Sequence, residues 1–416
     1  MSVTSEETHG TDDANTLGGI WRDYLAKVRG GDVGSLPAIL GLVVLVLAFS
    51  ILRPETFTKA FNFGNLIQQS SGVTILAMGL VFVLLLGEID LAAGYTAGTA
   101  AAVASVLLTN HEWPTGAAIL VGVLTGTLIG FFIGTIVSRL GIPSFVVTLA
   151  LFLALQGVVL SLIGEKGSID SGEWIAKLNS DNLPVWLGWV LAVVLVGSYA
   201  AMTFVSNRRR RRHGLTSEPT LLWALKSGGL AVLALLVVYY LSIERSPNPQ
   251  IKSITGVPIS LVIIIGLAIV LTILLSRTTW GSHVYAVGGN AEAARRAGIN
   301  VKLVQLSCFM MCSTVAALGG LMLASYSGGV NNVTGGNQTL LFAVGAAVIG
   351  GTSLFGGKGR VVDAIIGGTV VAVIANGMGL MNQPDSRKLI VTGLVLLVAA
   401  SVDAISRRKA AASGRV

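Results

Sequence analysis

Two acidic residues, Glu88 and Asp90, lie between two long apolar runs and are the first residues whose chemistry stands out. Ionisable side chains among apolar segments are costly and usually functional, so this pair would suit a proton or cation relay. The alternative for Asp90 is a helix cap, because the apolar run that starts at Leu91 leaves backbone N–H groups to satisfy. We prefer the capping interpretation, since the apolar runs place both acids at a turn.

Neutral amides and hydroxyls inside the apolar runs form a second group with recognisable chemistry. Such side chains suit a path for an uncharged polar solute, because they exchange hydrogen bonds without holding a charge. Each of them is equally suited to hydrogen-bond a neighbouring helix. The candidates for a substrate path, together with Asp90, are Asn65, Gln68, Gln69, Thr148, Gln156, Asn337 and Asn376.

No arrangement typical of catalysis or metal binding stands out in the sequence. The four histidines lie in the N-terminal segment or at the ends of apolar runs, as solvated residues do. Cys308 and Cys312 share a helix face without further ligands, so we expect them to pack as small apolar residues. The segment Gly356–Gly359 lacks the remaining features of a phosphate-binding loop. We therefore expect no catalytic residue, metal or cofactor on this chain, and any ATP to be bound by another polypeptide.

The elements that carry these residues are apolar runs suited to a bilayer. Hydrophobic residues make up 53% of the 416 residues and charged residues 12%, about half the share usual in soluble domains. Most runs approach the roughly 20 residues that a membrane span needs. The runs lie near 36–52, 65–86, 91–108, 115–138, 144–163, 185–205, 220–243, 257–275, 302–325, 339–356, 361–381 and 388–405. We predict an all-α polytopic membrane protein with about twelve (10–12) transmembrane helices, and a soluble enzyme is excluded.

Two glycine-rich segments suggest breaks in the helices and an internal repeat. The run at 339–356 is short and rich in glycine, so we expect a broken or re-entrant helix there. Gly350–Gly357 shares the pattern G-x3-L-x2-G with Gly87–Gly94, and each segment separates two apolar runs. Transporters are often built from two related halves, although a match this short also arises by chance.

The positive charges indicate how the chain is oriented. Most lysines and arginines fall in segments on the same side as the N-terminus, which predicts that both termini are cytoplasmic. We divide the chain into a cytoplasmic tail (1–35), a transmembrane domain (36–405) and a second cytoplasmic tail (406–416). The run Arg208–Arg212 directly follows a span, so we favour a topological stop signal over an anionic-lipid or nucleic-acid patch, and expect no nucleic-acid partner.

The segment 277–302 between two spans is the most informative cytoplasmic part. Residues 291–297 are good helix formers, Asn290 is a suitable N-cap, and Gly298 is a suitable stop. A short helix across the cytoplasmic face suits a membrane subunit that receives force from a soluble motor. A plain amphipathic connector is the alternative that the residues alone leave open.

Glu292, Ala293 and Ala294, with Gly298 four residues further on, resemble the Glu-Ala-Ala loop of bacterial ABC importer permeases. Further segments resemble the ribose, galactose and xylose branch of that family, and the likeness covers about residues 36–405. These segments are Tyr285–Asn290, Gly298–Asn300, Val348–Leu354 and Ile142–Leu149, and the basic loop Arg208–Leu215 with its extra span is similar to xylose-type permeases.

The resemblance implies a multi-pass permease of the cytoplasmic membrane, surrounded by membrane lipid, that carries a monosaccharide, with xylose the favoured substrate. It implies three partners: an ATPase subunit, an extracytoplasmic sugar-binding protein and a second permease copy in a homodimer. The residues that it places against the ATPase are Asn290, Glu292, Ala293, Ala294, Arg295 and Gly298. Position 88 departs from the family's Gly-Gly-Ile-Asp-Leu because it is Glu, which bears on substrate preference. The alternative function is an ion-coupled secondary transporter that uses Glu88 and Asp90.

Overall fold

The computed structural model describes residue 18, residues 34–215 and residues 218–412. The predicted N-terminal tail, 1–35, therefore lies almost entirely outside the described residues. The chain divides into two compact units. The larger unit consists of Gly34–Asp181 and Pro258–Asp403, and the smaller one includes Asn182–Val257. Each unit is described by itself.

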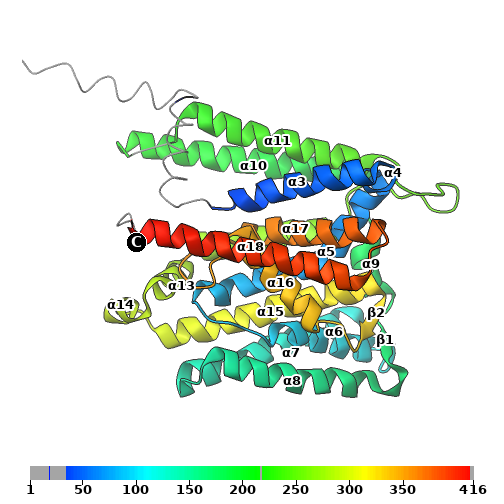
Figure 1. Cartoon of the computed structure of the whole chain (residues 1–416), viewed down its shortest axis with the longest axis horizontal. Coiled ribbons are helices and arrows are strands. Elements are labelled where there is room, and N and C mark those ends of the chain that lie inside the picture. Colours follow the sequence, from blue (N-terminus) through cyan, green and yellow to red (C-terminus); the bar gives the residue numbers. More distant parts are fainter. Residues whose placement is uncertain (1–17, 19–33, 216–217, 413–416) are drawn as a thin grey trace, which may run out of the picture. The chain divides into compact units, whose positions relative to one another are not determined.

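Two central helices, α5 and α15, form the core of the larger unit. In α5 (Ala60–Leu85) 83% of the most apolar stretch is buried, and in α15 (Val301–Ser327) 67% is buried. Three further helices, α6 (Ala93–Thr109), α7 (Thr115–Thr135) and α17 (Val361–Leu380), pack against this pair (Figure 1). Helices enclosed in this way need small or apolar side chains all round, and both central helices supply them.

Outer helices of the larger unit expose apolar side chains instead of burying them. In α8 33% of the apolar stretch is buried and in α12 28%. Such apolar faces suit contact with the hydrocarbon chains of lipids, which offer no hydrogen-bond partners. The bounds of these and further helices are Leu36–Leu52 (α3), Pro54–Phe57 (α4), Ser144–Ile163 (α8), Ile259–Arg277 (α12), Asn337–Gly350 (α16, which is mostly buried) and Asp385–Ala412 (α18).

A row of four glycines lets α7 approach α15 and α6 closely. Gly122, Gly126, Gly130 and Gly134 recur every four residues and therefore lie on one helix face. A Cβ at Gly126 would lie 2.7 Å from the Ser313 carbonyl oxygen, well inside an ordinary contact. Small residues at this spacing are a common means of packing membrane helices, because they let backbones come together.

Each of the twelve predicted apolar runs coincides with a helix, which confirms the helical, polytopic class. Eight helices in the described part of the chain are long and apolar enough to cross a membrane. The helix α16 has 14 residues, or about 21 Å at 1.5 Å per residue, and is too short to cross a hydrocarbon core of about 30 Å. Residues 351–360 after it are not helical. The helix therefore ends within the predicted run 339–356, which confirms the predicted break. The ten non-helical residues 351–360 separate α16 from α17.

A small sheet and a short helix, which the sequence did not predict, cover one end of α15. Strand β1 (Ser168–Asp170) pairs antiparallel with β2 (Gly329–Asn331), so that Ile169 faces Val330. A single 3-10 turn (η2, Gly164–Lys166) precedes β1. The helix α9 (Glu173–Ser180) buries Ile175 and packs on α15 and α12. At the opposite end of α7 the chain continues as a π-helical turn (η1, Ile136–Leu140).

The smaller unit is a helical hairpin of α10 (Val185–Arg212) and α11 (Thr220–Ser242). The helix α10 extends beyond the predicted run at 185–205 and contains the whole arginine run. Positive side chains at a helix C-terminus interact favourably with the helix dipole, which explains why the charges do not end the helix. The connection from α11 to α12 is held by Arg245, whose guanidinium donates to the Gly256 carbonyl at 2.7 Å.

Candidate functional site

The short helix of the segment 277–302 forms as the sequence predicts. In α14 (Ala291–Arg296) the Asn290 side chain accepts a hydrogen bond from the Ala293 N–H at 2.9 Å, as an N-cap does. At the other end Gly298 has a φ of +87° and its N–H donates to the Arg295 carbonyl. The following N–H, of Ile299, donates to the Ala294 carbonyl, which completes a Schellman motif. Both predicted ends of the helix are thus confirmed.

The α14 side chains are divided between a buried anchor and an exposed charged face. Ala294 is 5% exposed, whereas Glu292, Arg295 and Arg296 are exposed. Glu292 forms ion pairs with both arginines, and its Oε1 lies 3.1 Å from the Arg296 Nε. The helix is therefore attached to the larger unit by one side and presents the other to solvent.

The helix α13 (Thr279–Gly289) connects α14 to the two glycine-rich segments of the repeat pattern. Gly288 approaches the end of α5 so closely that a Cβ there would lie 1.9 Å from the Leu85 carbonyl oxygen. That same oxygen accepts a hydrogen bond of 2.8 Å from the Gly357 N–H. Gly87 and Gly356 lie beside this junction, where a Cβ added at Gly87 would lie 3.7 Å from the Gly356 nitrogen. The segments 87–94 and 350–357 therefore meet each other and α13 at one place.

A second tether joins α13 to the loop before α17. The Tyr285 hydroxyl donates to the Gly359 carbonyl at 2.7 Å, and burial raises the pKa of this tyrosine. Arg360 and Asp363 form a capping box at the start of α17, with the Arg360 Nη2 2.8 Å from an Asp363 carboxylate oxygen. The helix α13 is therefore attached both to the end of α5 and to the loop before α17.

A cavity of about 660 Å³ lies beside α14. Its lining includes Glu88, Arg295, Lys302 and Gln305, together with the start of the segment Ile142–Leu149. The Gln305 side chain donates to the Glu88 carboxylate at 3.3 Å. Glu88 therefore belongs to the surroundings of the short helix, while its neighbour Asp90 does not.

Asp90 is 1% exposed and its Oδ1 accepts a hydrogen bond from the Ala93 N–H at 3.1 Å. This is the geometry expected for a carboxylate that satisfies the first turn of α6. The carboxyl also lies beside the thiol of Cys312, which with Cys308 is buried in α15. Its position supports the capping interpretation of Asp90.

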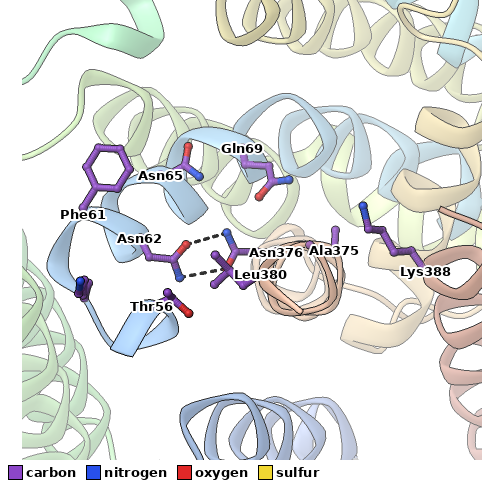
Figure 2. A pocket seen from close by; sticks show the side chains of 11 residues that line it. Thr56, Phe61, Asn62, Asn65, Gln69, Ala375, Asn376, Leu380 and Lys388 are labelled. Carbon is purple, nitrogen blue, oxygen red and sulfur yellow. Dashed lines mark hydrogen bonds between the residues drawn. The ribbon is translucent and has the colours of Figure 1, made fainter. Parts of the chain in front are cut away.

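A second cavity, of about 370 Å³, is lined by amides of α5 and α17 (Figure 2). Asn62 and Asn376 face each other there and exchange two hydrogen bonds, of 3.0 and 2.9 Å. Asn65 and Gln69 follow Asn62 at helical spacing and so lie along the same side of α5. The Gln69 Oε1 is buried and accepts no hydrogen bond from any described residue. Lys388 of α18 adds a positive charge to the wall.

Asn62 is the lining residue that the sequence analysis missed. The predicted span began at 65, three residues too late to include Asn62, because the apolar composition rises only there. The spacing of Asn62, Asn65 and Gln69 by three and four residues is the signal that identifies one polar helix face. Three predicted path residues, Asn65, Gln69 and Asn376, are thus brought together with a fourth amide.

The other candidates for the path lie elsewhere, and one of them joins two helices. The Gln68 side chain donates to the Asn179 carbonyl at 2.6 Å, and Asn179 donates back to the Gln68 carbonyl at 3.1 Å, which attaches α9 to α5. The Thr148 hydroxyl donates to the Ser144 carbonyl at 2.8 Å within α8. Gln156 is half-buried on α8, and Asn337 is exposed at the start of α16. None of these four lines the amide cavity.

Residues 62–400 match a family described as branched-chain amino acid transport system / permease component. The chain is 31% identical over 371 residues to the xylose transport system permease protein of Escherichia coli K12, covering 89% of this chain and 92% of that one. It is 27% identical to the fructose import permease protein of Rhizobium meliloti (91% and 88% covered) and 28% identical to the ribose import permease protein of E. coli K12 (88% and 92% covered). No solved structure matches the chain.

Proposed function

Since the chain belongs to the family of branched-chain amino acid transport system permease components, we propose that it carries xylose or a related pentose or hexose inward as the membrane subunit of an ATP-driven importer. It is a multi-pass protein of the cytoplasmic membrane, and as a translocation subunit it breaks no bond itself. The ATPase, the extracytoplasmic binding protein and a second, identical permease copy are its proposed partners. Both termini are proposed to be cytoplasmic.

The observation that carries this proposal is the construction of α13 and α14. A helix of six residues, capped at both ends and attached through Ala294, exposes a charged face suited to a groove on a soluble protein. The preceding helix contacts the end of α5 at Leu85 and the loop at Gly357. Force applied to α14 would therefore reach the non-helical segments that follow α5 and α16. A plain connector would need neither the caps nor these contacts.

The substrate path is proposed to include the amide cavity of α5 and α17. A monosaccharide offers many hydroxyl groups and no charge, and amides serve as both donors and acceptors for such groups. The side chains of Asn62 and Asn376 hydrogen-bond to each other, and Gln69 Oε1 offers an unused acceptor. Exchange of amide–amide hydrogen bonds for amide–hydroxyl ones changes the free energy little, which suits a site that must release its ligand.

The experiment that tests this function is sugar uptake by proteoliposomes containing the permease and its ATPase, with the binding protein outside. We expect xylose uptake that requires enclosed ATP, stops when the ATPase is replaced by a hydrolysis-deficient variant, and persists when the proton gradient is dissipated. Uptake by the permease alone on an ion gradient would instead establish the secondary transporter that uses Glu88 and Asp90. The comparisons do not favour that alternative, because the relatives are named as transport system or import permease proteins.

A further inference from the structure

A cavity of about 190 Å³ lies between the C-terminal turns of α10 and the first turn of α11. Its wall combines two aromatic rings with hydrogen-bond donors and two guanidinium groups. The lining residues are Phe204, Asn207, Arg208, Arg211, Thr220 and Trp223. All of them belong to the helical hairpin of the smaller unit.

The aromatic side of this cavity is held in place by specific contacts. The Trp223 indole N–H donates to the Thr203 hydroxyl at 3.0 Å. The ring of Trp223 packs against that of Phe204, with centroids 5.3 Å apart and planes inclined by 52°. Tryptophan with one apolar side and one hydrogen-bonded nitrogen is the residue typical of the boundary between hydrocarbon and water.

The basic side of the cavity is held by hydrogen bonds as well. The Arg211 Nη2 donates to the Thr220 hydroxyl at 2.9 Å and to the Glu218 carbonyl at 3.1 Å. The carboxylate of Glu218 pairs with Lys226 at 2.6 Å. Arg208 lies one turn before Arg211 on the same face of α10, above Phe204.

The neighbouring surface changes from apolar to basic within two helical turns. On α10, Met202 and Val205 are 68% and 46% exposed, and on α11, Leu225 is 50% exposed. Five consecutive arginines follow on α10. An isolated phosphate ion would find cations here but no use for the aromatic wall. A glycerophospholipid would place its acyl chains along the apolar faces and its phosphate beside the arginines.

We propose that this cavity binds the phosphodiester headgroup of an anionic glycerophospholipid of the phosphatidylglycerol type at the edge of the membrane. Basic pockets between membrane helices, where the helices leave the bilayer, have the chemistry for such headgroups. A topological stop signal requires only positive charge, whereas this site adds a cavity, oriented donors and an indole. The site does not depend on the proposed substrate, and its test needs no transport.

The test measures lipid binding to the full-length chain in a neutral detergent by native mass spectrometry. Dioleoylphosphatidylglycerol is titrated against dioleoylphosphatidylcholine, which has the same chains and no net charge. The test variants are Arg208→Gln and Arg208→Gln/Arg211→Gln. The matched controls are Arg209→Gln and Arg209→Gln/Arg210→Gln, which remove the same charge from the same run without touching the cavity lining.

We expect the wild type to prefer phosphatidylglycerol by at least tenfold. The Arg208→Gln variant should bind it about fivefold more weakly, and the double variant about thirtyfold, as expected for one and two basic residues near the headgroup. The controls should lose no more than about threefold. The single variant leaves the hydrogen bonds of Arg211 in place, and a melting temperature equal to that of the wild type shows that the hairpin is intact.

Three results would overturn the proposal. Equal binding of the two lipids would show that charge is not recognised. Equal losses in Arg208→Gln and Arg209→Gln would show a diffuse attraction without a site. Displacement of the lipid by millimolar inorganic phosphate or glycerol 3-phosphate would show that the cavity recognises a soluble anion.

Discussion

The contact of Gly288 with the end of α5 gives the sharpest test of how α13 is connected to the transmembrane core. An added Cβ at this position would lie 1.9 Å from the Leu85 carbonyl oxygen and 3.0 Å from the Gly357 nitrogen. Contacts below 3.0 Å do not occur for real Cβ atoms, so the Gly288→Ala variant must move α13 by more than 1 Å. The adjacent Gly289 provides the control, because nothing lies within 4 Å of a Cβ there.

The size of the effect follows from two terms. Forcing an extra methyl group into a packed contact costs about 1 to 3 kcal/mol. Separation of α13 from α5 also weakens the hydrogen bond from Gly357 to Leu85, which contributes roughly 0.5 to 1.5 kcal/mol. The Gly288→Ala variant should therefore lose about 1.5 to 4.5 kcal/mol of stability. Gly289→Ala should be neutral or stabilising by up to about 1 kcal/mol, because alanine favours helix.

Two assays read out the comparison. Thermal unfolding of the purified chain reports stability, and xylose uptake with the partner ATPase and binding protein reports coupling. A bias of about 2 kcal/mol changes the population of the native α13 arrangement about thirtyfold, so uptake per ATP hydrolysed should fall clearly in Gly288→Ala. If the two alanine variants melt at the same temperature and transport equally well, the contact does not constrain α13 and our account of the junction is wrong.

Three further predictions concern other parts of the chain. Asn376→Leu should destabilise the protein by about 1 to 3 kcal/mol, because the buried amide of Asn62 loses its partner, and Asn62→Leu/Asn376→Leu should recover part of this loss in thermal unfolding. Gly298→Ala should cost about 1 to 2 kcal/mol at its φ of +87° and reduce uptake without preventing membrane insertion; unchanged sugar accumulation would contradict the role of α14. The pKa of Glu244 is held at about 2, against an ordinary 4.5, chiefly by a hydrogen bond from the Ser253 hydroxyl. Because this pKa is lowered in the folded state, the stabilisation of the loop 244–256 is complete above about pH 4.5 and is lost as the pH falls towards 2, which hydrogen exchange would detect and which Glu244→Gln would abolish.

Local patterns in the sequence were sufficient for the helices and for the caps of α14. Apolar runs locate membrane helices because the bilayer requires every span to be apolar and internally hydrogen-bonded. Asn290 and Gly298 were identified because a cap depends on residues within one turn. Composition was less informative at the end of α10, where the helix continues through Arg212 into a segment expected to be a loop.

Contacts between distant segments could not be read from composition or periodicity. The pairing of Gln68 with Asn179 joins residues 111 positions apart, and either side chain alone would suit a sugar path equally well. Strands β1 and β2 have three residues each, too few to show an alternating pattern. The meeting of Gly87 with Gly356 follows from the way α5, α13 and α16 converge, which no local motif encodes.

The glycine row of α7 has a consequence for how the subunit moves. Three of its glycines, Gly126, Gly130 and Gly134, approach α15 closely, so that a shift of α7 along α15 would bring their atoms into collision. We therefore expect α7 and α15 to move together as one unit. We expect helices to shift relative to each other instead where they are joined by polar side chains. The Asn62–Asn376 pair between α5 and α17 is such a contact, because its hydrogen bonds can be exchanged for others without separating closely packed backbones.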